Sequence, residues 1–285
     1  MSVLSATPAT TRRLQLRPRA GVLGATIVAG FALLAISAWL GLAGSDWAVI
    51  SAGAWESPST KHWLGTNRLG QDIFARAVQS TATAFETGML VAVSATLAGA
   101  LIGGIAGWYR SRWLDESLVW LTGVLEAIPF YLFAAALAFA MHGQDWAMHL
   151  AMVLTFWTGT ARLVRAEVMR MRELEYVLAA RAAGISQFRI LLRHLLPNTS
   201  HILGVQAGLV FVAAIKTEVI LSFLGLGIQD GISWGLMLAE STQEVLMGQF
   251  GNFLVASTML FLLALGINLV TDAYQERLSP REGMT

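Results

Sequence analysis

The chain contains apolar runs that are long enough to cross a membrane as helices. The first, Val22–Gly44, has 23 residues without a charge, and a helix that spans a bilayer needs roughly 20 apolar residues. Only 13% of the 285 residues are charged, whereas soluble domains carry about a quarter. We therefore predict an all-α, polytopic membrane protein with six transmembrane helices. The predicted spans are Val22–Gly44, Thr87–Trp108, Ser117–Met141, Trp146–Arg165, Ile202–Phe223 and Phe253–Thr271.

Basic residues mark one side of the predicted membrane. If the six spans cross the membrane in alternating directions, 15 of the 19 Lys and Arg residues lie in segments on the same side of it. Since Lys and Arg accumulate in cytoplasmic loops, both termini and the 162–198 segment are expected to be cytoplasmic. The expected division is into cytoplasmic tails at 1–20 and 273–285, a retained first span at 21–44, an external loop at 45–85, and a core of five spans at 86–272.

The segment Glu175–Asn198 interrupts the apolar pattern and predicts a helix, a turn and a second helix. Gly184 is suited to the positive φ that ends a helix, and Ser186 is suited to cap the next one. Pro197 is expected to end the second helix or to follow its end. The pattern alone fits an amphipathic connector between membrane helices as well as a surface whose alanines let another protein approach closely.

This segment resembles the cytoplasmic coupling loop, or EAA loop, of binding-protein-dependent ABC importers. In the peptide and nickel branch of that family the loop follows a pattern close to E-Y-V-x-A-A-R-A-x-G-x-S-x3-I-x3-H-x2-P-N. The matching residues are Glu175, Tyr176, Val177, Ala179, Ala180, Arg181, Ala182, Gly184, Ser186, Ile190, His194, Pro197 and Asn198. Leu178 and His194 depart from the more general form of the loop, and these departures are features of the branch.

Other segments carry the same resemblance from about residue 60 onward. The external segment His62–Arg76 is similar to H-x-L-G-T-D-x-x-G-R-D, with Asn67 and Gln71 as departures. The further matches are Trp157, Arg162 and Arg165 before the loop, Leu221–Gly227 and Trp234–Leu238 after it, and Asn268, Leu269, Asp272, Leu278 and Pro280 near the end.

The resemblance implies the fold of a type I ABC importer permease in the bacterial cytoplasmic membrane. The expected partners are a second, homologous permease, two ABC ATPase subunits or one fused chain, an extracytoplasmic binding protein and the lipid bilayer, with no nucleic acid. The ATPases are expected to dock on residues 166–198, where Glu175 and Arg181 make polar contacts and Gly184 sets the angle between the coupling helices. The expected coupling residues are Glu175, Tyr176, Ala179, Ala180, Arg181, Ala182, Gly184, Ile185 and Ser186. The cargo is expected to be peptides, nickel or other metal chelates, or similar small solutes.

The chain lacks the motifs of an enzyme or a nucleotide site. No G-x4-G-K-[ST] phosphate loop occurs, because neither Lys61 nor Lys216 follows a glycine. With no cysteine, thiolate metal sites and disulfides are excluded. We expect no catalysis and no cofactor on this chain, with ATP and Mg bound by the partner ATPases. The polar residues expected to be solvated rather than metal-bound are His62, His142, Asp145 and His149.

Three charged residues, Glu126, Lys216 and Glu218, lie inside predicted spans, where a charge usually faces the bundle interior or water. They are candidates for the translocation pathway. Lys216 is expected either to pair with Glu126 or to face, like Glu218, a hydrated cavity. A second interpretation places Glu126 near the cytoplasmic end of the third span with an arginine partner. Pro129 is expected to kink that span.

Two features of helix packing are also predicted. Gly99, Gly103 and Gly107 recur every four residues in the second predicted span, and this spacing indicates close contact with another helix. The residues expected to lie on the membrane, in an interfacial helix before that span, are Ile73, Phe74, Ala77 and Val78.

Two other functions are compatible with parts of the sequence. The stretch AARAAGISQFRI resembles a helix-turn-helix reading head, but a DNA duplex bound there would press against the bilayer. A stand-alone secondary transporter would favour inverted sequence halves, which are not evident. DNA binding, or transport by the purified chain alone, would distinguish these functions from that of an importer subunit.

Overall fold

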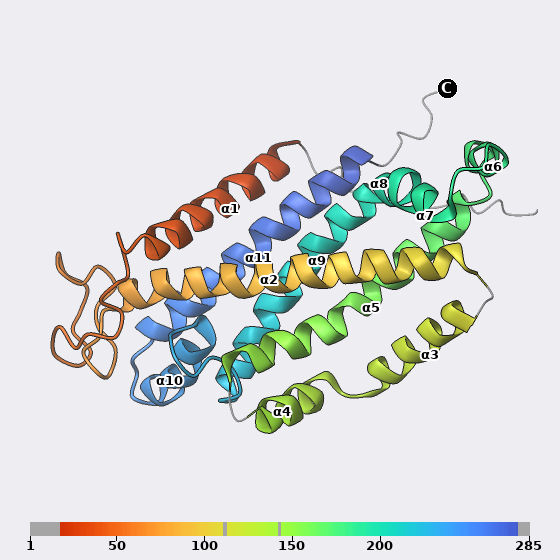
Figure 1. Cartoon of the computed structure of the whole chain (residues 1–285). Coiled ribbons are helices and arrows are strands. Elements are labelled where there is room, and N and C mark those ends of the chain that lie inside the picture. The colour runs from red at the N-terminus through yellow and green to blue at the C-terminus, as the bar shows by residue number, and fades with distance from the viewer. Residues whose placement is uncertain (1–17, 111–112, 142–143, 279–285) are drawn as a thin grey trace, which may run out of the picture.

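The computed structural model describes residues 18–110, 113–141 and 144–278. Within these ranges the chain consists of helices joined by turns and one long loop at residues 40–72, and its only β pairings are two isolated bridges, Ile50 with Gln71 and Thr66 with Asp72. This agrees with the predicted all-α class. The long helices lie side by side as a bundle (Figure 1). The helical segments are α1 Pro18–Trp39, α2 Ile73–Trp108, α3 Trp113–Ala127, α4 Phe130–Ala140, α5 Asp145–Met171, α6 Glu175–Ala182, α7 Gln187–Ile190, the π-helical turn η1 Leu191–Leu195, α8 Leu196–Asn198, α9 Ser200–Phe223, α10 Trp234–Leu246 and α11 Gly251–Leu278.

Four helices of the described chain, α1, α2, α9 and α11, are long and apolar enough to cross a membrane. They coincide with four of the six predicted spans. The third predicted span is broken, because α3 and α4 meet at an angle of 87° on either side of Ile128 and Pro129. A proline lacks the backbone N–H that an uninterrupted helix would use and crowds the preceding turn. The predicted kink at Pro129 is therefore confirmed.

The fourth predicted span corresponds to α5, which is 27 residues long but is not among the helices that composition alone marks as spans. It packs along α2 and also contacts α4 and α9, and Ala147, Ala151 and Ala161 on it are fully buried. A helix enclosed by other helices needs less apolar surface than one that faces lipid. The bundle thus holds four apolar spans, or five with the bent pair, and α5 as the sixth stays a prediction.

Small residues let α2 and α5 approach closely, as the spacing of the glycines predicts. A Cβ atom added at Gly99 would lie 2.6 Å from the Cβ of Thr160, and one added at Gly107 would lie 2.6 Å from the carbonyl oxygen of Arg165. A Cβ at Gly103 would overlap the backbone carbonyl of Ala161. Contact between two helix backbones is a main source of helix association in lipid, so these glycines join α2 and α5 into one unit.

A single helix, α2, replaces the predicted interfacial helix and second span, and its 36 residues run without a break. Asp72 begins it by accepting a hydrogen bond from the N–H of Phe74 at 2.7 Å. Ile73, Ala77 and Val78 are buried rather than lying on the membrane. The physical reason is that α1, α10 and α11 all pack on this part of α2.

The long loop between α1 and α2 is held to α10 by polar contacts. The side chain of Arg76, which is 2% exposed, donates a hydrogen bond to Oε2 of Glu240 at 2.6 Å, and it also donates to Gln71. The backbone N–H of Arg68 donates to Oε1 of Glu244 at 2.8 Å. The loop, the start of α2 and α10 therefore form one packed unit at this end of the bundle.

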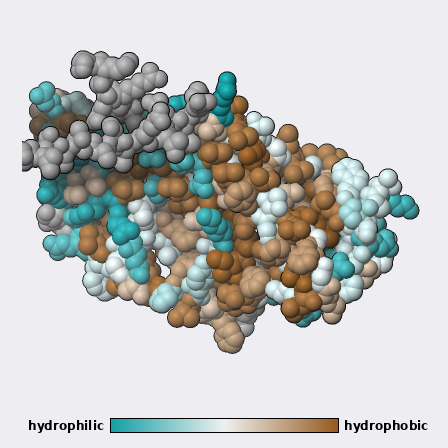
Figure 2. Space-filling model, turned by 180° about the vertical axis from the view of Figure 1, so that it is seen from behind, coloured by the Kyte–Doolittle hydropathy of each residue, from teal (hydrophilic) through white to brown (hydrophobic). Residues whose placement is uncertain are grey.

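The surface changes in polarity along the bundle. Figure 2 shows apolar side chains across the middle of the molecule and polar side chains toward its ends. Leu33, Leu97 and Phe261 are among the exposed apolar residues. The short helices α6 to α8 lie at the end opposite α10 (Figure 1), so the segment predicted to couple to other proteins is separate from the long loop between α1 and α2.

Candidate coupling site at one end of the bundle

The predicted helix, turn and second helix are present, and α6 leads to α7 through Gly184. Gly184 has a φ of +79°, its N–H donates to the carbonyl of Arg181 at 3.0 Å, and the N–H of Ile185 donates to the carbonyl of Ala180 at 3.1 Å. This pair of hydrogen bonds is a Schellman helix end, which favours glycine because L side chains rarely adopt positive φ. The predicted helix end is confirmed. Ser186 stands at the N-cap of α7 as predicted, but its hydroxyl forms no capping hydrogen bond.

Pro197 does not end the second helix, contrary to the prediction. The helix α7 widens into the π-helical turn η1 and continues through α8 toward α9. A proline in an α-helix presses on the carbonyl four residues before it, which here belongs to Arg193 within η1. A π-helical turn is wider than an α-helical one and accommodates this crowding. The coupling segment therefore leads directly into a membrane-spanning helix.

The helix α6 has one buried face and one exposed face. Val177 is fully buried in a cluster with Val168 and Met171 of α5 and Ile190 and Leu195 of the second helix. The exposed large apolar residues of the segment are Leu174, Tyr176, Leu178, Phe188 and Leu192. Ala179, Ala182 and Ala183 are also exposed. An apolar patch on a protruding element is typical of a contact site, and the small alanines permit another backbone to approach.

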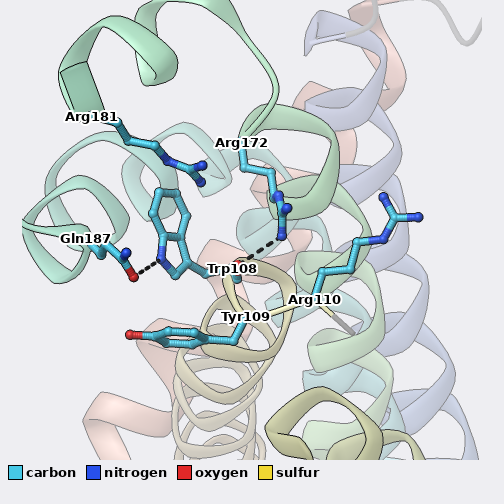
Figure 3. Close-up of a pocket in the computed structure, with 6 residues that line it drawn as sticks. All are labelled: Trp108, Tyr109, Arg110, Arg172, Arg181 and Gln187. Carbon is cyan, nitrogen blue, oxygen red and sulfur yellow. Dashed lines mark hydrogen bonds between the residues drawn. The ribbon is translucent and has the colours of Figure 1, made fainter. Parts of the chain in front are cut away.

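Trp108, which the sequence analysis did not single out, connects both coupling helices to the bundle (Figure 3). The guanidinium carbon of Arg181 lies 4.2 Å from the centre of the Trp108 ring, as in a cation–π contact. The indole N–H donates to Oε1 of Gln187 at 3.2 Å, and the Trp108 carbonyl accepts from Nη1 of Arg172 at 3.0 Å. Trp108 is 5% exposed and joins the ends of α2 and α5 to α6 and α7.

The structure brings all the predicted coupling residues together in α6 and the turn that follows it. Most are exposed, while Ala180 and Ile185 are partly buried. The Tyr176 hydroxyl accepts a hydrogen bond from Nδ2 of Asn198 at 3.4 Å, and Arg181 is engaged with Trp108. Their contacts with an ATPase stay predictions.

An ion pair lies near the end of α5, where the coupling segment begins. Nε of Arg170 lies 3.0 Å from Oε2 of Glu167. This hydrogen bond lowers the pKa of the Glu167 carboxyl below its ordinary value, burial opposes the shift, and the charges of Arg170 and His201 add to it. The pair holds a carboxylate in its ionised form beside the coupling helices.

The three charged residues predicted for the pathway are not grouped into one site. Nη1 of Arg162 lies 2.8 Å from Oε2 of Glu126, so the predicted pairing of Glu126 with Lys216 is wrong and the alternative, an arginine partner, is confirmed. Lys216 is exposed on α9. Glu218 is 1% exposed and accepts a hydrogen bond from the Ser222 hydroxyl at 2.6 Å. A role of these residues in a pathway stays a prediction.

The histidines form no metal-binding group among the residues that the structure describes. His62, expected to be solvated, is mostly buried, and its Nδ1 lies 2.9 Å from Oδ2 of Asp72. Nε2 of His149, also expected to be solvated, lies 3.0 Å from the hydroxyl of Thr87 and so connects α5 to α2. Outside the described part lie His142 and the side chain of Asp145.

Comparison with known families gives a match that includes the whole coupling segment. The family of binding-protein-dependent transport system inner membrane components matches residues 99–283. The match begins in the second half of α2 and continues past the end of α11, so it includes Trp108 and all of α5 to α9.

Individual relatives of this chain are named as permease proteins of peptide transport systems. The dipeptide transport system permease protein DppC of Bacillus subtilis (strain 168) is 35% identical over 79% of this chain and 70% of its own length. The oligopeptide transport system permease protein OppC of Mycobacterium bovis is 35% identical over 79% of this chain and 78% of its own length. DppC of Alkalihalophilus pseudofirmus is 33% identical over 91% of this chain and 85% of its own length. The chain therefore belongs to the family of binding-protein-dependent transport system inner membrane components, which have the fold of type I ABC importer permeases.

Proposed function

We propose that this chain is one of two permease subunits of an ATP-driven peptide importer, and that α6 and α7 receive the movement of separate ATPase subunits. Membership of the family and the multi-pass architecture support a role as a membrane component of an ABC transport system. The observation that carries the coupling role is the exposed apolar surface of α6, whose opposite face is fixed to α5 through Val177 and to α2 through Trp108.

The buried contacts of α6 provide a route by which its movement reaches the spans. Val177 packs against the end of α5, and Arg181 lies on Trp108 at the end of α2. Because α2 and α5 interlock at Gly103, they are expected to move together. ATPases that close on nucleotide would tilt this pair and so alternate the access of the pathway between the two sides of the membrane.

The partners follow from the family. Permeases of ABC transport systems work with ATPases and binding proteins. For this chain we propose a second, homologous permease, two ATPase subunits or one fused chain, and an external binding protein at the end formed by α10 and the external loop. ATP and Mg would be held by the ATPases. The excess of Lys and Arg around α6 supports a cytoplasmic location for α6 and for both termini.

Peptides are the proposed substrate class. Relatives that are 33–35% identical to this chain are named as dipeptide and oligopeptide permeases. The ligand of the binding protein that purifies with the assembled complex would identify the substrate.

The absence of cysteine from the chain allows a direct test with single introduced thiols. Ala182→Cys places a thiol on the exposed side of α6. Leu246→Cys places one at a position that is 87% exposed at the opposite end of the bundle and serves as the matched control. A membrane-impermeant maleimide is expected to label the Leu246→Cys variant in right-side-out vesicles and the Ala182→Cys variant only in inside-out vesicles.

The same two variants test the docking of the ATPases. In detergent, where both positions are accessible, added ATPase subunits are expected to protect the Ala182→Cys variant and to leave labelling of the Leu246→Cys variant unchanged. Labelling of the Ala182→Cys variant from outside, or equal labelling with and without ATPase, would contradict the proposal. Peptide transport by the purified chain alone would instead favour a secondary transporter.

A further inference from the structure

A hollow lined by three arginines lies between the coupling helices and the end of α2. It has a volume of about 160 Å³ and is lined by Trp108, Tyr109, Arg110, Arg172, Arg181 and Gln187. Figure 3 shows Arg181 over the Trp108 ring, and Arg172 between Arg181 and Arg110. A cavity of about 150 Å³ accepts a molecule of the size of benzene, so the hollow has room for a small ionic group.

The hollow carries an excess of positive charge. Nε of Arg172 lies 2.9 Å from Oε1 of Glu173, whose side chain is 62% exposed. Among the ion pairs of the described residues, no acidic side chain is a partner of Arg110 or Arg181. Arg181 lies over the Trp108 ring, and its guanidinium carries five N–H donors. The three guanidinium groups therefore suit an anion with several oxygens, and phosphate is such an anion.

The hollow lies at the level where the apolar surface of α2 ends. The exposed apolar residues of α2 extend from Met89 to Ile105, which corresponds to about 24 Å of helix, close to the roughly 30 Å hydrocarbon core of a bilayer. Trp108 follows less than one turn after Ile105, and Trp113 at the start of α3 is 72% exposed. Tryptophans at the ends of apolar segments mark the membrane interface, where phospholipid phosphates lie.

We propose that this hollow binds the phosphate group of an anionic phospholipid of the cytoplasmic leaflet. Basic pockets between membrane helices on the cytoplasmic side are known to hold such headgroups. The phosphate would bridge Arg110 after α2, Arg172 after α5 and Arg181 on α6, and so fix the coupling helix to the two spans that it moves. This lipid site goes beyond the proposed transport function. It rests on that function only for the assignment of α6 to the cytoplasmic side of the membrane.

A phospholipid fits the hollow better than a carboxylate of a docked ATPase. The side chain of Arg181 is directed back onto Trp108 at the end of α2, whereas the exposed alanines and apolar residues of α6 face away from its buried contacts. The exposed apolar surface of α2 lies next to the hollow, and acyl chains attached to a bound phosphate would cover it.

The test measures lipid retention and requires no ATP turnover, so its result is independent of the coupling experiment. The full-length chain is reconstituted in nanodiscs of phosphatidylcholine and phosphatidylglycerol, extracted in mild detergent and analysed by native mass spectrometry. The double variant Arg110→Gln/Arg181→Gln is expected to retain phosphatidylglycerol roughly tenfold less than the unmodified chain. The control, Arg189→Gln/Arg193→Gln, removes two exposed charges of the same segment outside the hollow and is expected to retain as much as the unmodified chain.

The single variant Arg110→Gln keeps the test decisive if the double variant fails to fold, because Arg110 is exposed and, among the contacts of the described residues, has none like that of Arg181 with Trp108. A partial loss of phosphatidylglycerol in this variant would support the site. Equal retention in the Arg110→Gln variant and the control would overturn it. Binding of inorganic phosphate without any preference for phosphatidylglycerol would assign the hollow to free phosphate, and loss of the lipid when ATPase subunits bind would assign it to a partner carboxylate. Either result would also overturn the proposal.

Discussion

At Gly184 the backbone conformation, and not the surrounding space, restricts which residue can stand in the turn. Its φ is +79°, yet no atom lies within 4 Å of an added Cβ. Gly184→Val is expected to destabilise the turn by about 1–2 kcal/mol and to change the angle between α6 and α7. In the reconstituted complex, stimulation of the ATPases by the loaded binding protein should fall, while the amount of assembled complex stays the same.

Asparagine provides the matched comparison at the same position, because it enters the left-handed region more easily than other non-glycine residues. Gly184→Asn is therefore expected to keep most of the stimulation. If valine and asparagine reduced it equally, side-chain bulk at the ATPase contact would be the cause and the backbone argument would be wrong.

The residues of the turn could be predicted from the sequence, whereas Trp108 could not. The roles of Gly184 and its neighbours depend on hydrogen bonds within six residues, which a local pattern reveals. Trp108 derives its role from Arg172 and Gln187, which follow it by 64 and 79 residues. A tryptophan at the end of an apolar run fits an ordinary interfacial anchor equally well, so no local signal distinguishes the two roles.

Among the helices, the contact between α2 and α5 gives a prediction that can be measured without transport. A Cβ at Gly103 would overlap the backbone of Ala161. Gly103→Ala is therefore expected to force the helices apart and to lower the free energy of unfolding by about 1–3 kcal/mol. Thermal unfolding of the purified chain in detergent would measure the change.

Gly123 on α3 is the control for this substitution, since no atom lies within 4 Å of an added Cβ there. Gly123→Ala should leave stability unchanged or raise it by up to about 1 kcal/mol, because alanine is the better helix former. Equal unfolding temperatures for the two alanine variants would show that the glycines do not mediate close packing.

Long apolar helices are predicted more accurately than helices whose burial depends on distant elements. Each of α1, α2, α9 and α11 contains an apolar stretch long enough to cross a membrane, and this stretch alone identifies it. The local pattern predicts an interfacial helix at the early turns of α2 because α10 and α11, which help to bury these turns, come more than 150 residues later. Likewise, the continuation of the helix through Pro197 depends on the π-helical turn before it, which local propensity does not reveal.

At the scale of the whole molecule, α2 connects the two functional ends. Arg76 fastens its first turn to Glu240 of α10, and Trp108 at its last residue contacts the coupling helices. The 36 residues of α2 span about 54 Å, longer than the bilayer core. A displacement of α6 at one end can therefore reach the loop between α1 and α2 at the other end through a single helix.

The ion pair between Arg76 and Glu240 gives a prediction about the order of two stabilities. Glu240→Ala leaves the buried guanidinium of Arg76 without its carboxylate, and removal of one partner of a buried pair costs about 3 kcal/mol. Arg76→Met should cost less, since Glu240 is 28% exposed and can bind water. Thermal unfolding in detergent would rank the two variants, and the reverse order would contradict the assigned burial.

The Glu240→Ala variant also tests whether the two ends of the bundle work independently of each other. In Glu240→Ala the contact between α10 and the start of α2 is weakened, while α6, Val177 and Trp108 at the far end remain as they are. Peptide transport is expected to fall, and ATPase protection of the thiol in an Ala182→Cys background is expected to persist. Loss of that protection would mean that the ion pair between Arg76 and Glu240 is needed to keep α6 in place. The two ends of α2 would then not be stable independently of each other.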